Sequence, residues 1–343
     1  MYDYELQKAA DTLIGDLFKV KPGETVVITC DSLSCMNVVN AVMSSAHAAG
    51  ALPMMIKFPA PDGIGQAADP KLPIEPLTAA VSNCDVWIEF NQKWLLYSTP
   101  YLRAIEANKK MRYMCLVEYT EDVLIRTLKD LNSEKLAAFM NKVADLNRAA
   151  KVTRMTTPAG TDVTFETNPE HTILVDAGLA SKSGIYMMAG QLNVVPKFGS
   201  VNGTIVFDGT VTPPFGRNPD VPIRLTVKNS EIVKVEGGAD AKAYEKWLKS
   251  FDDPGMLKMA HVAYGFNPGA QLSGNVVEDE RVWGVTEWGI GYVSPIIAPP
   301  DGQQAISHTD GICIDTSVWI DGVQIMDKGK MVDPELEAMY PHN

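Results

Sequence analysis

The first 150 residues alternate short apolar runs with longer amphipathic segments. The apolar runs are rich in β-branched and aromatic residues, which is typical of buried strands. We expect strands at 24–30, 52–59, 84–91 and 112–118, and helices at 1–20, 35–50, 98–110 and 133–150. Strands that alternate with helices imply a mostly parallel sheet with helices on its faces. The sequence therefore predicts an α/β domain over residues 1–150.

From residue 151 onward, short strands are separated by polar turns such as "DG", "KNSE" and "DKGK". This spacing is typical of antiparallel sheets. We expect a barrel-like or sandwich-like arrangement that is interrupted by one helix at 239–253. The sequence therefore predicts a second domain over residues 151–343, of the α+β class and rich in antiparallel strands.

Composition and motifs exclude several classes of protein. The formal net charge of −12 argues against a nucleic-acid surface, which needs clustered Lys and Arg, and against docking on anionic membranes. No run approaches the roughly 20 apolar residues of a membrane span, and the acidic amphipathic N-terminus is unlike a signal peptide. We therefore expect a cytoplasmic protein. The chain has no G-x-G-x-x-G, no Walker A motif and no CxxC pair, which argues against a nucleotide site and a structural zinc site.

Candidate chemistry is concentrated between residues 260 and 310, in the segments "AHVAYGF", "TEWGIGY" and "SHTDGI". The period of two in a strand places His261, Glu287, and the pair His308 and Asp310 each on one face, with small residues beside them. Two imidazoles with one carboxylate suit non-haem Fe(II), and the same set could bind Zn(II) or Mn(II). Glu287 is either a fourth ligand or a base outside the metal's ligand shell.

The order of "NPGA", "GNVVEDERVWG" and "SHTDG…DG" resembles the thermophilic aminopeptidase family (aminopeptidase T), whose members are dinuclear metallopeptidases, and the resemblance covers most of the chain. It is incomplete at the ligands. Gln191 and His261 stand where those peptidases have glutamates, and Glu287 stands where they have a histidine. His308 and Asp310 keep their identities. The loss of a carboxylate at position 191 puts peptidase activity in doubt.

The chain is more similar to the 2,5-dihydroxypyridine 5,6-dioxygenase branch, on the segments "AHVAYG", "SFDDP" and "SHTD". This resemblance implies an Fe(II) centre of His261, His308 and Asp310 that cleaves a hydroxylated pyridine or similar aromatic ring with O2. It also implies a homo-oligomer. Two positions depart from the branch, because Tyr97 and Tyr186 replace histidines.

Residues around the centre are also expected to have roles, among them Glu287, a carboxylate that is added relative to that branch. We expect Tyr97 and Tyr186 to donate hydrogen bonds to the substrate or to its oxygen partner, and Glu287 to deprotonate a substrate hydroxyl. The residues expected to line the substrate pocket are Trp94, Gln191 and Tyr264.

Two other functions stay open at this point. A mononuclear metallohydrolase would cut an amide, lactam or peptide bond with Glu287 as its general base. A non-catalytic homologue would bind a small molecule and retain no metal. Dependence of turnover on O2 separates the first alternative from a dioxygenase.

Overall fold

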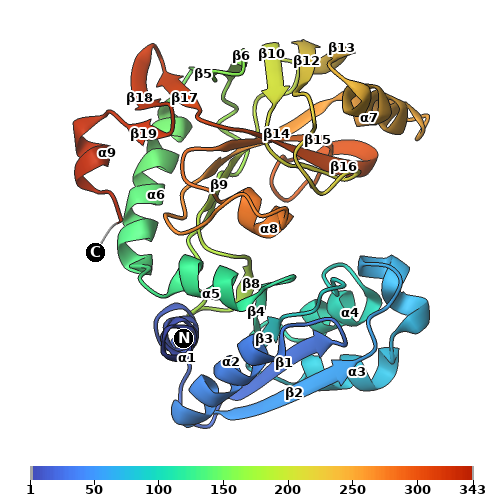
Figure 1. Ribbon diagram of the computed structural model, residues 1–343, viewed down its shortest axis with the longest axis vertical. Coiled ribbons are helices and arrows are strands. Elements are labelled where there is room, and N and C mark those ends of the chain that lie inside the picture. The colour runs from blue at the N-terminus through green and yellow to red at the C-terminus, as the bar shows by residue number, and fades with distance from the viewer. Residues whose placement is uncertain (1–2, 342–343) are drawn as a thin grey trace. The chain divides into compact units, whose positions relative to one another are not determined.

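The computed structural model describes residues 3–341, and its contacts divide the chain into two compact units. Unit 1 comprises the described residues up to Glu134 together with Gly178–Ala189, and unit 2 comprises Lys135–Ala177 and the described residues from Gly190 onward. Unit 1 has one sheet and unit 2 has two, and buried apolar residues occur in both. Figure 1 shows the elements of both.

Unit 1 is built on a five-stranded sheet with the order β2-β1-β3-β4-β8, in which every pair is parallel. Its strands are β1 (Thr25–Asp31), β2 (Leu52–Phe58), β3 (Val86–Glu89), β4 (Arg112–Cys115) and β8 (Gly184–Tyr186). Its helices are α1 (Asp3–Asp11), the π-helical η1 (Thr12–Leu17), α2 (Met36–Ala48), the 3-10 helix η2 (Gly65–Lys71), α3 (Ile74–Val81), α4 (Thr99–Ala107) and α5 (Glu121–Leu128). The central strands β1, β3 and β4 are almost wholly buried, as the unbroken apolar runs of their sequences require. The predicted α/β architecture is confirmed.

The chain does not divide into the two units at a single boundary after residue 150. Helix α6 (Ser133–Ala149) lies almost entirely in unit 2, and β8 returns to unit 1 to pair with β4. A three-residue strand within a polar stretch carries too little apolar pattern to predict this return from the sequence.

Unit 2 contains two antiparallel sheets. The eight-stranded sheet has the order β13-β12-β10-β6-β5-β17-β18-β19, and the six-stranded sheet has the order β11-β16-β15-β14-β9-β7. The strands of the first are β5 (Val152–Thr156), β6 (Asp162–Glu166), β10 (Asn202–Phe207), β12 (Ile223–Lys228), β13 (Glu231–Glu236), β17 (Ser317–Ile320), β18 (Val323–Asp327) and β19 (Lys330–Met331). The strands of the second are β7 (Leu174–Asp176), β9 (Gln191–Val194), β11 (Val211–Thr212), β14 (Met259–Gly265), β15 (Thr286–Val293) and β16 (Gln303–Cys313). The predicted antiparallel character of this half is confirmed.

The two sheets of unit 2 meet through apolar side chains. The rings of Phe165 on β6 and Trp288 on β15 pack edge to face at 5.9 Å, and both side chains are buried. Because neighbours along a strand point to opposite faces, burial of Trp288 places Glu287 and Gly289 on the other face of the six-stranded sheet. The remaining helices of unit 2 are α7 (Ala239–Lys249), the 3-10 helix η3 (Pro254–Leu257), α8 (Val276–Asp279) and α9 (Pro334–Ala338).

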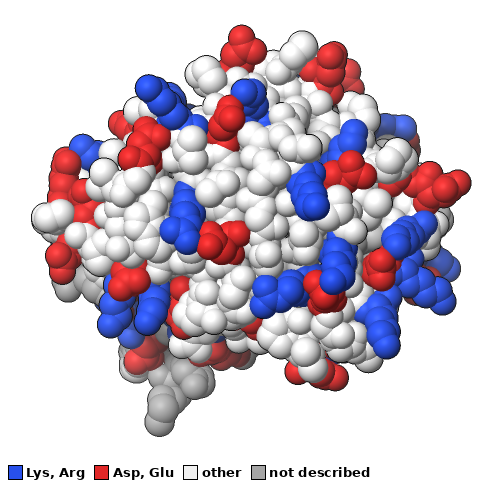
Figure 2. All heavy atoms as spheres, turned by 90° about the horizontal axis from the view of Figure 1, so that it is seen from above, with Lys and Arg blue, Asp and Glu red and all other residues white. Residues whose placement is uncertain are grey.

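Acidic and basic side chains are interspersed on the face of the molecule that Figure 2 shows. Exposed ion pairs of unit 2 such as Arg154–Asp162, at 2.8 Å, and Lys234–Glu236, at 2.7 Å, are of this mixed kind. Over residues 3–341 there is no helix with both the length and the apolar character that crossing a membrane requires. The expected cytoplasmic location and homo-oligomer stay predictions.

Candidate metal centre

Three neighbouring strands of the six-stranded sheet position the predicted ligands. His261 lies on β14, His308 and Asp310 lie on β16, and β15 runs between them. Gly289 of β15 is the register partner of both His261 and Asp310, and Gly291 is the partner of His308. A Cβ atom on Gly289 would stand 2.4 Å from Cε1 of His261. Glycine at this position therefore leaves the room in which the imidazole lies over the central strand.

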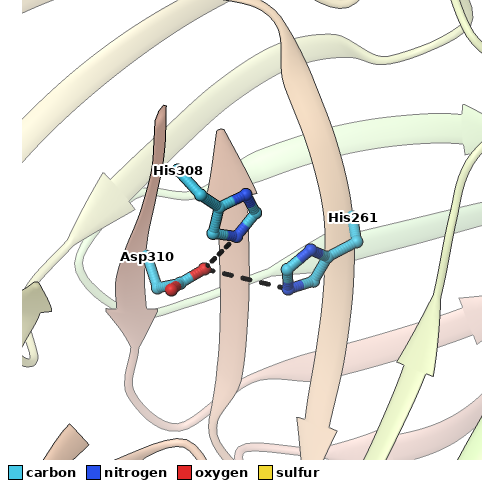
Figure 3. A group of neighbouring side chains, drawn as sticks. All are labelled: His261, His308 and Asp310. Carbon is cyan, nitrogen blue, oxygen red and sulfur yellow. Dashed lines mark hydrogen bonds and ion pairs between the residues drawn. The ribbon is translucent and has the colours of Figure 1, made fainter. Parts of the chain in front are cut away.

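The three side chains converge on one point (Figure 3). The Nε2 atom of His308 is 2.8 Å from Oδ1 of Asp310, and the Nε2 atom of His261 is 3.8 Å from the same oxygen. The two imidazole rings are stacked with their centroids 5.0 Å apart. One ligand atom from each of the three residues lies within 4.8 Å of the others, which is a spacing that a single metal ion can bridge.

Backbone contacts and partial exposure make the triad suitable for a ligand role. Nδ1 of His308 lies 2.9 Å from the carbonyl oxygen of Tyr292, so this nitrogen is the donor and Nε2 is the atom left to bind a metal. The exposed fractions of the three side chains are 12% for His261, 30% for His308 and 18% for Asp310. The three side chains are therefore partly accessible to solvent.

The pKa values of both imidazoles are raised in the absence of a cation. Burial lowers the pKa of His308, but the Asp310 carboxylate outweighs it and raises the pKa to about 9. Burial likewise lowers the pKa of His261, and the neighbouring Glu287 carboxylate reverses this and raises it. A divalent cation would replace these protons at the same nitrogens, so two imidazole nitrogens and a carboxylate fit such an ion.

Glu287 lies beside the triad and is almost fully buried. Its Oε1 is 2.6 Å from Nε2 of His261, and its Oε2 accepts a hydrogen bond of 2.8 Å from Nε2 of Gln191. Burial raises the pKa of Glu287, and the charge of Asp310 raises it further. The carboxylate is thus in contact with the predicted ligand His261 through Oε1, and it also interacts with Asp310.

Gln191 connects Glu287 to two further charged side chains, those of Glu280 and Arg281. Gln191 also donates to Oε2 of Glu280 at 3.0 Å, and its own Oε1 accepts from Nη2 of Arg281 at 2.9 Å. Arg281 is fully buried, and burial raises the pKa of Glu280 to about 7. Gln191 was expected to contact substrate, whereas its amide is already engaged by protein groups at both ends.

Tyr264 lies away from the triad. It is an odd number of residues from His261 on β14, so it points to the opposite face of the sheet. Its side chain is buried, its hydroxyl donates to Oδ1 of Asn147 at 2.9 Å, and its ring stacks on Phe266. We therefore leave Tyr264 out of the substrate site that is proposed below.

The other three expected residues belong to unit 1. Nε1 of Trp94 donates to Oε1 of Glu118 at 3.4 Å, and the hydroxyl of Tyr186 donates to the carbonyl of Lys182 at 2.9 Å. Tyr97 is largely exposed and has a positive φ of 69°, which an L-residue adopts at a conformational cost. The position of unit 1 relative to the triad is not determined, so the roles of Trp94, Tyr97 and Tyr186 stay predictions.

A comparison with known protein families decides the relationship that the motifs indicated. The family model described as 2,5-dihydroxypyridine 5,6-dioxygenase matches residues 15–333. The chain belongs to this family. Its predicted resemblance to the dioxygenase branch is confirmed over nearly the whole sequence.

Individual relatives agree with this membership. The 2,5-dihydroxypyridine 5,6-dioxygenase of Pseudomonas putida strain KT2440 is 29% identical over 94 residues, and that stretch is 27% of this chain and 27% of the relative. The sequence alignment thus spans about a quarter of the relative's length.

Two solved structures share the fold. The structure of 2,5-dihydroxypyridine dioxygenase from Pseudomonas putida KT2440 matches with a TM-score of 0.77 at 19% identity, over 98% of this chain and 99% of that one. Wild-type AmpT from Thermus thermophilus matches with a TM-score of 0.68 at 15% identity, over 97% of this chain and 100% of that one. The predicted similarity to the aminopeptidase T fold is therefore also confirmed.

Membership of this dioxygenase family implies a metal cofactor, O2 and a small-molecule substrate. A group of histidine and carboxylate ligands that can hold one metal ion is present in the described part of the chain, at His261, His308 and Asp310. The family and the site geometry thus agree on metal-dependent chemistry.

Glu280 and Arg281 were missed as neighbours of the site. The available signal was the run "VEDER", in which Glu278, Asp279 and Arg281 are fully buried although four charged residues in a row usually face solvent. Their contact with Gln191 joins positions about ninety residues apart, which no local pattern predicts.

Proposed function

We propose that this protein is an Fe(II)-dependent dioxygenase that opens a hydroxylated pyridine or a similar hydroxylated aromatic ring. The observation that carries the proposal is the convergence of His261, His308 and Asp310 on one face of the six-stranded sheet. Two imidazoles and one carboxylate with free positions are the donor set that non-haem Fe(II) oxygenases use, although Zn(II) and Mn(II) also accept it. Bound Fe(II) would supply the one-electron chemistry that lets O2 react with an electron-rich ring.

Protein groups outside the triad hold the ligands in place. The carbonyl of Tyr292 accepts from Nδ1 of His308 and so fixes both the ring orientation and the tautomer. Gly289 leaves the space that the ring of His261 fills. The triad is therefore arranged before any metal binds, which is how ligand sites gain affinity and selectivity.

Glu287 is the residue that we assign to proton transfer. Nε2 of His261 cannot donate to Glu287 and bind a cation at the same time, so metal binding leaves Oε1 of Glu287 without this donor. A carboxylate oxygen that has lost this donor is placed beside the centre to accept the proton of a substrate hydroxyl.

Strand β16, which carries two of the ligands, also offers an exposed apolar residue. Ile306 lies two residues before His308 and is 68% exposed. An aromatic ring that lies beside the triad would cover this side chain and remove apolar surface from water. This placement favours a flat, partly apolar substrate.

The direct test is O2 consumption. Metal-free protein is loaded with Fe(II) under anaerobic conditions and offered 2,5-dihydroxypyridine, other hydroxylated pyridines and catechols. The proposal predicts substrate-dependent O2 uptake that is lost on chelation and absent after loading with Zn(II). Stoichiometric iron without any uptake over this panel would contradict it.

A metal-dependent hydrolase is the second candidate, and the observation that favours it is Glu287. A buried carboxylate beside the triad could take a proton from a water nucleophile as well as from a substrate hydroxyl. The same loaded protein would then release an amine or acid from an amide or lactam without consuming O2. A non-catalytic homologue would instead show neither reaction and retain no metal.

A further inference from the structure

Gln191 of β9 lies between two carboxylates, of which Glu287 is buried and Glu280 is partly exposed, and one buried guanidinium. Its Nε2 donates to Glu287 and to Glu280, and its Oε1 accepts from Arg281. A guanidinium offers only donors and an ionised carboxylate offers only acceptors. The amide of Gln191 therefore has one orientation in this network, with its oxygen toward Arg281 and both N–H bonds toward the carboxylates.

Arg281 is itself immobilised. Its Nη1 donates to the carbonyl of Val277 at 2.7 Å and to Oε2 of Glu280 at 2.9 Å, while Nη2 donates to Gln191. The side chain is fully buried, so a rotation would leave a buried charge without partners, which is strongly unfavourable. The fixed guanidinium of Arg281 therefore also fixes the orientation of the Gln191 side-chain amide.

The rigid network fixes the contact between Gln191 and Glu287. Oε2 of Glu287 is held by Gln191, which leaves Oε1 directed at His261. We propose that Gln191 and Arg281 are positioning residues that keep Oε1 of Glu287 on the triad side, where it can accept the proton of the substrate. The role in turnover rests on the proposed function, whereas the placement of Glu287 does not. Gln191 is thus assigned a positioning role in place of the substrate contact that the sequence predicted for it.

Gln191→Met is the principal test, because methionine has a similar length and no amide. The inference predicts that kcat falls by about 10- to 100-fold, the range typical of residues that orient a catalytic group. The affinity of the metal-free protein for Fe(II) changes little, because the three ligands are intact. In a Glu287→Gln background, Gln191→Met causes no further loss, since both changes act on one carboxylate.

Gln303→Met is the matched control. Gln303 is also a buried glutamine of the six-stranded sheet, but its Nε2 donates to the carbonyls of Met259 and Gly291. Loss of that amide removes two hydrogen bonds of similar kind without touching Glu287. This variant is expected to lose stability and to keep its kcat.

A second readout needs neither metal nor turnover. The chain has five histidines, so the ring-nitrogen NMR spectrum of metal-free protein is simple enough to assign. The signal of Nε2 in His261 reports its hydrogen bond to Glu287. Gln191→Met and Arg281→Lys are expected to move this signal, because lysine keeps the charge but lacks the planar fork, and Gln303→Met is expected to leave it in place.

The outcomes separate the inference from its alternatives. A raised KM with unchanged kcat in Gln191→Met would overturn the inference and restore a substrate contact, as would a loss that adds to that of Glu287→Gln. An unmoved His261 signal would overturn it too. If wild-type protein consumes no O2, the proposed function fails while the NMR signal still decides the inference. If Arg281→Lys does not fold, Gln191→Met carries the test alone.

Discussion

Two buried carboxylates, Glu89 in unit 1 and Glu287 in unit 2, show how similar electrostatics can accompany different roles. Both are almost completely inaccessible to solvent, and burial is the largest cause of the raised pKa of each. For Glu89 the pKa rises to about 7. A raised pKa therefore does not by itself mark a functional carboxylate.

The two differ in the donors that hold them. Glu89 accepts hydrogen bonds from the amide of Leu95 and from the hydroxyl of Tyr113, each at 2.5 Å. Neither donor is a predicted metal ligand. Glu287 accepts hydrogen bonds from Gln191, whose side chain is fixed, and from His261, whose Nε2 would instead bind a metal ion. We infer that Glu89 is structural, and that Glu287 has one oxygen that metal binding releases.

The largest expected effect is the loss of the metal in His308→Ala. Removal of one of three ligands leaves too few donors for stable binding, and equilibrium dialysis of the variant with Fe(II) should find no stoichiometric metal. His171→Ala is the control, because His171 is also buried in unit 2 and contacts a backbone carbonyl, that of Val195. Full retention of iron in His308→Ala would remove the triad from consideration.

Glu287→Gln should lower kcat by about 10²- to 10⁴-fold, the contribution typical of a general base, and should leave metal content nearly unchanged. Glu89→Gln is the matched change in the comparison. It should keep kcat and lose about 1–3 kcal/mol of stability, because the new amide cannot accept from all the donors around it. An equal loss of metal and turnover in Glu287→Gln would instead make Glu287 a ligand.

Gly289→Ala should weaken Fe(II) binding by about 10- to 100-fold, because the new methyl group would push the ring of His261 out of place. Metal titration of the purified variant measures this. Gly15→Ala is the control, since a Cβ there meets nothing within 4 Å and its φ is not positive. Wild-type affinity in Gly289→Ala would mean that His261 is not held against β15.

The smallest expected effect is a change in the pH dependence of stability. The folded-state pKa of Glu89 lies near 7, above the ordinary value of 4.5, so the stability contributed by its protonated form is present below about 4.5 and is lost as the pH rises through 7. Glu89→Gln cannot titrate, and thermal melts of this variant should show a shallower decline of Tm over that interval. An unchanged slope would contradict the assignment of the raised pKa to Glu89.

The fold class could be predicted because it rests on local periodicity, whereas the set of His261, His308 and Asp310 was expected from the family resemblance. A period of two places His308 and Asp310 on one face, and the alternation of strands with helices marks unit 1. The same rule should have removed Tyr264 from the site, since it alternates with His261 and Ala263 along β14.

What could not be predicted depends on tertiary contacts. The partners of Gln191 are about ninety residues away in the sequence, so its role as a support for Glu287 has no local signature. The return of β8 to unit 1 likewise depends on pairing with β4 rather than on its own three residues.

The central claim is that both atoms of O2 enter the ring-opened product at a centre held by His261, His308 and Asp310. The most direct measurement is mass spectrometry of the product formed by Fe(II)-loaded protein from 2,5-dihydroxypyridine under ¹⁸O2. The account predicts that both oxygen atoms of the labelled gas appear in the product and that His308→Ala forms none. A product that carries no label under ¹⁸O2, but gains it when the reaction is run in H2¹⁸O, would contradict the account and favour hydrolysis with Glu287 as the base.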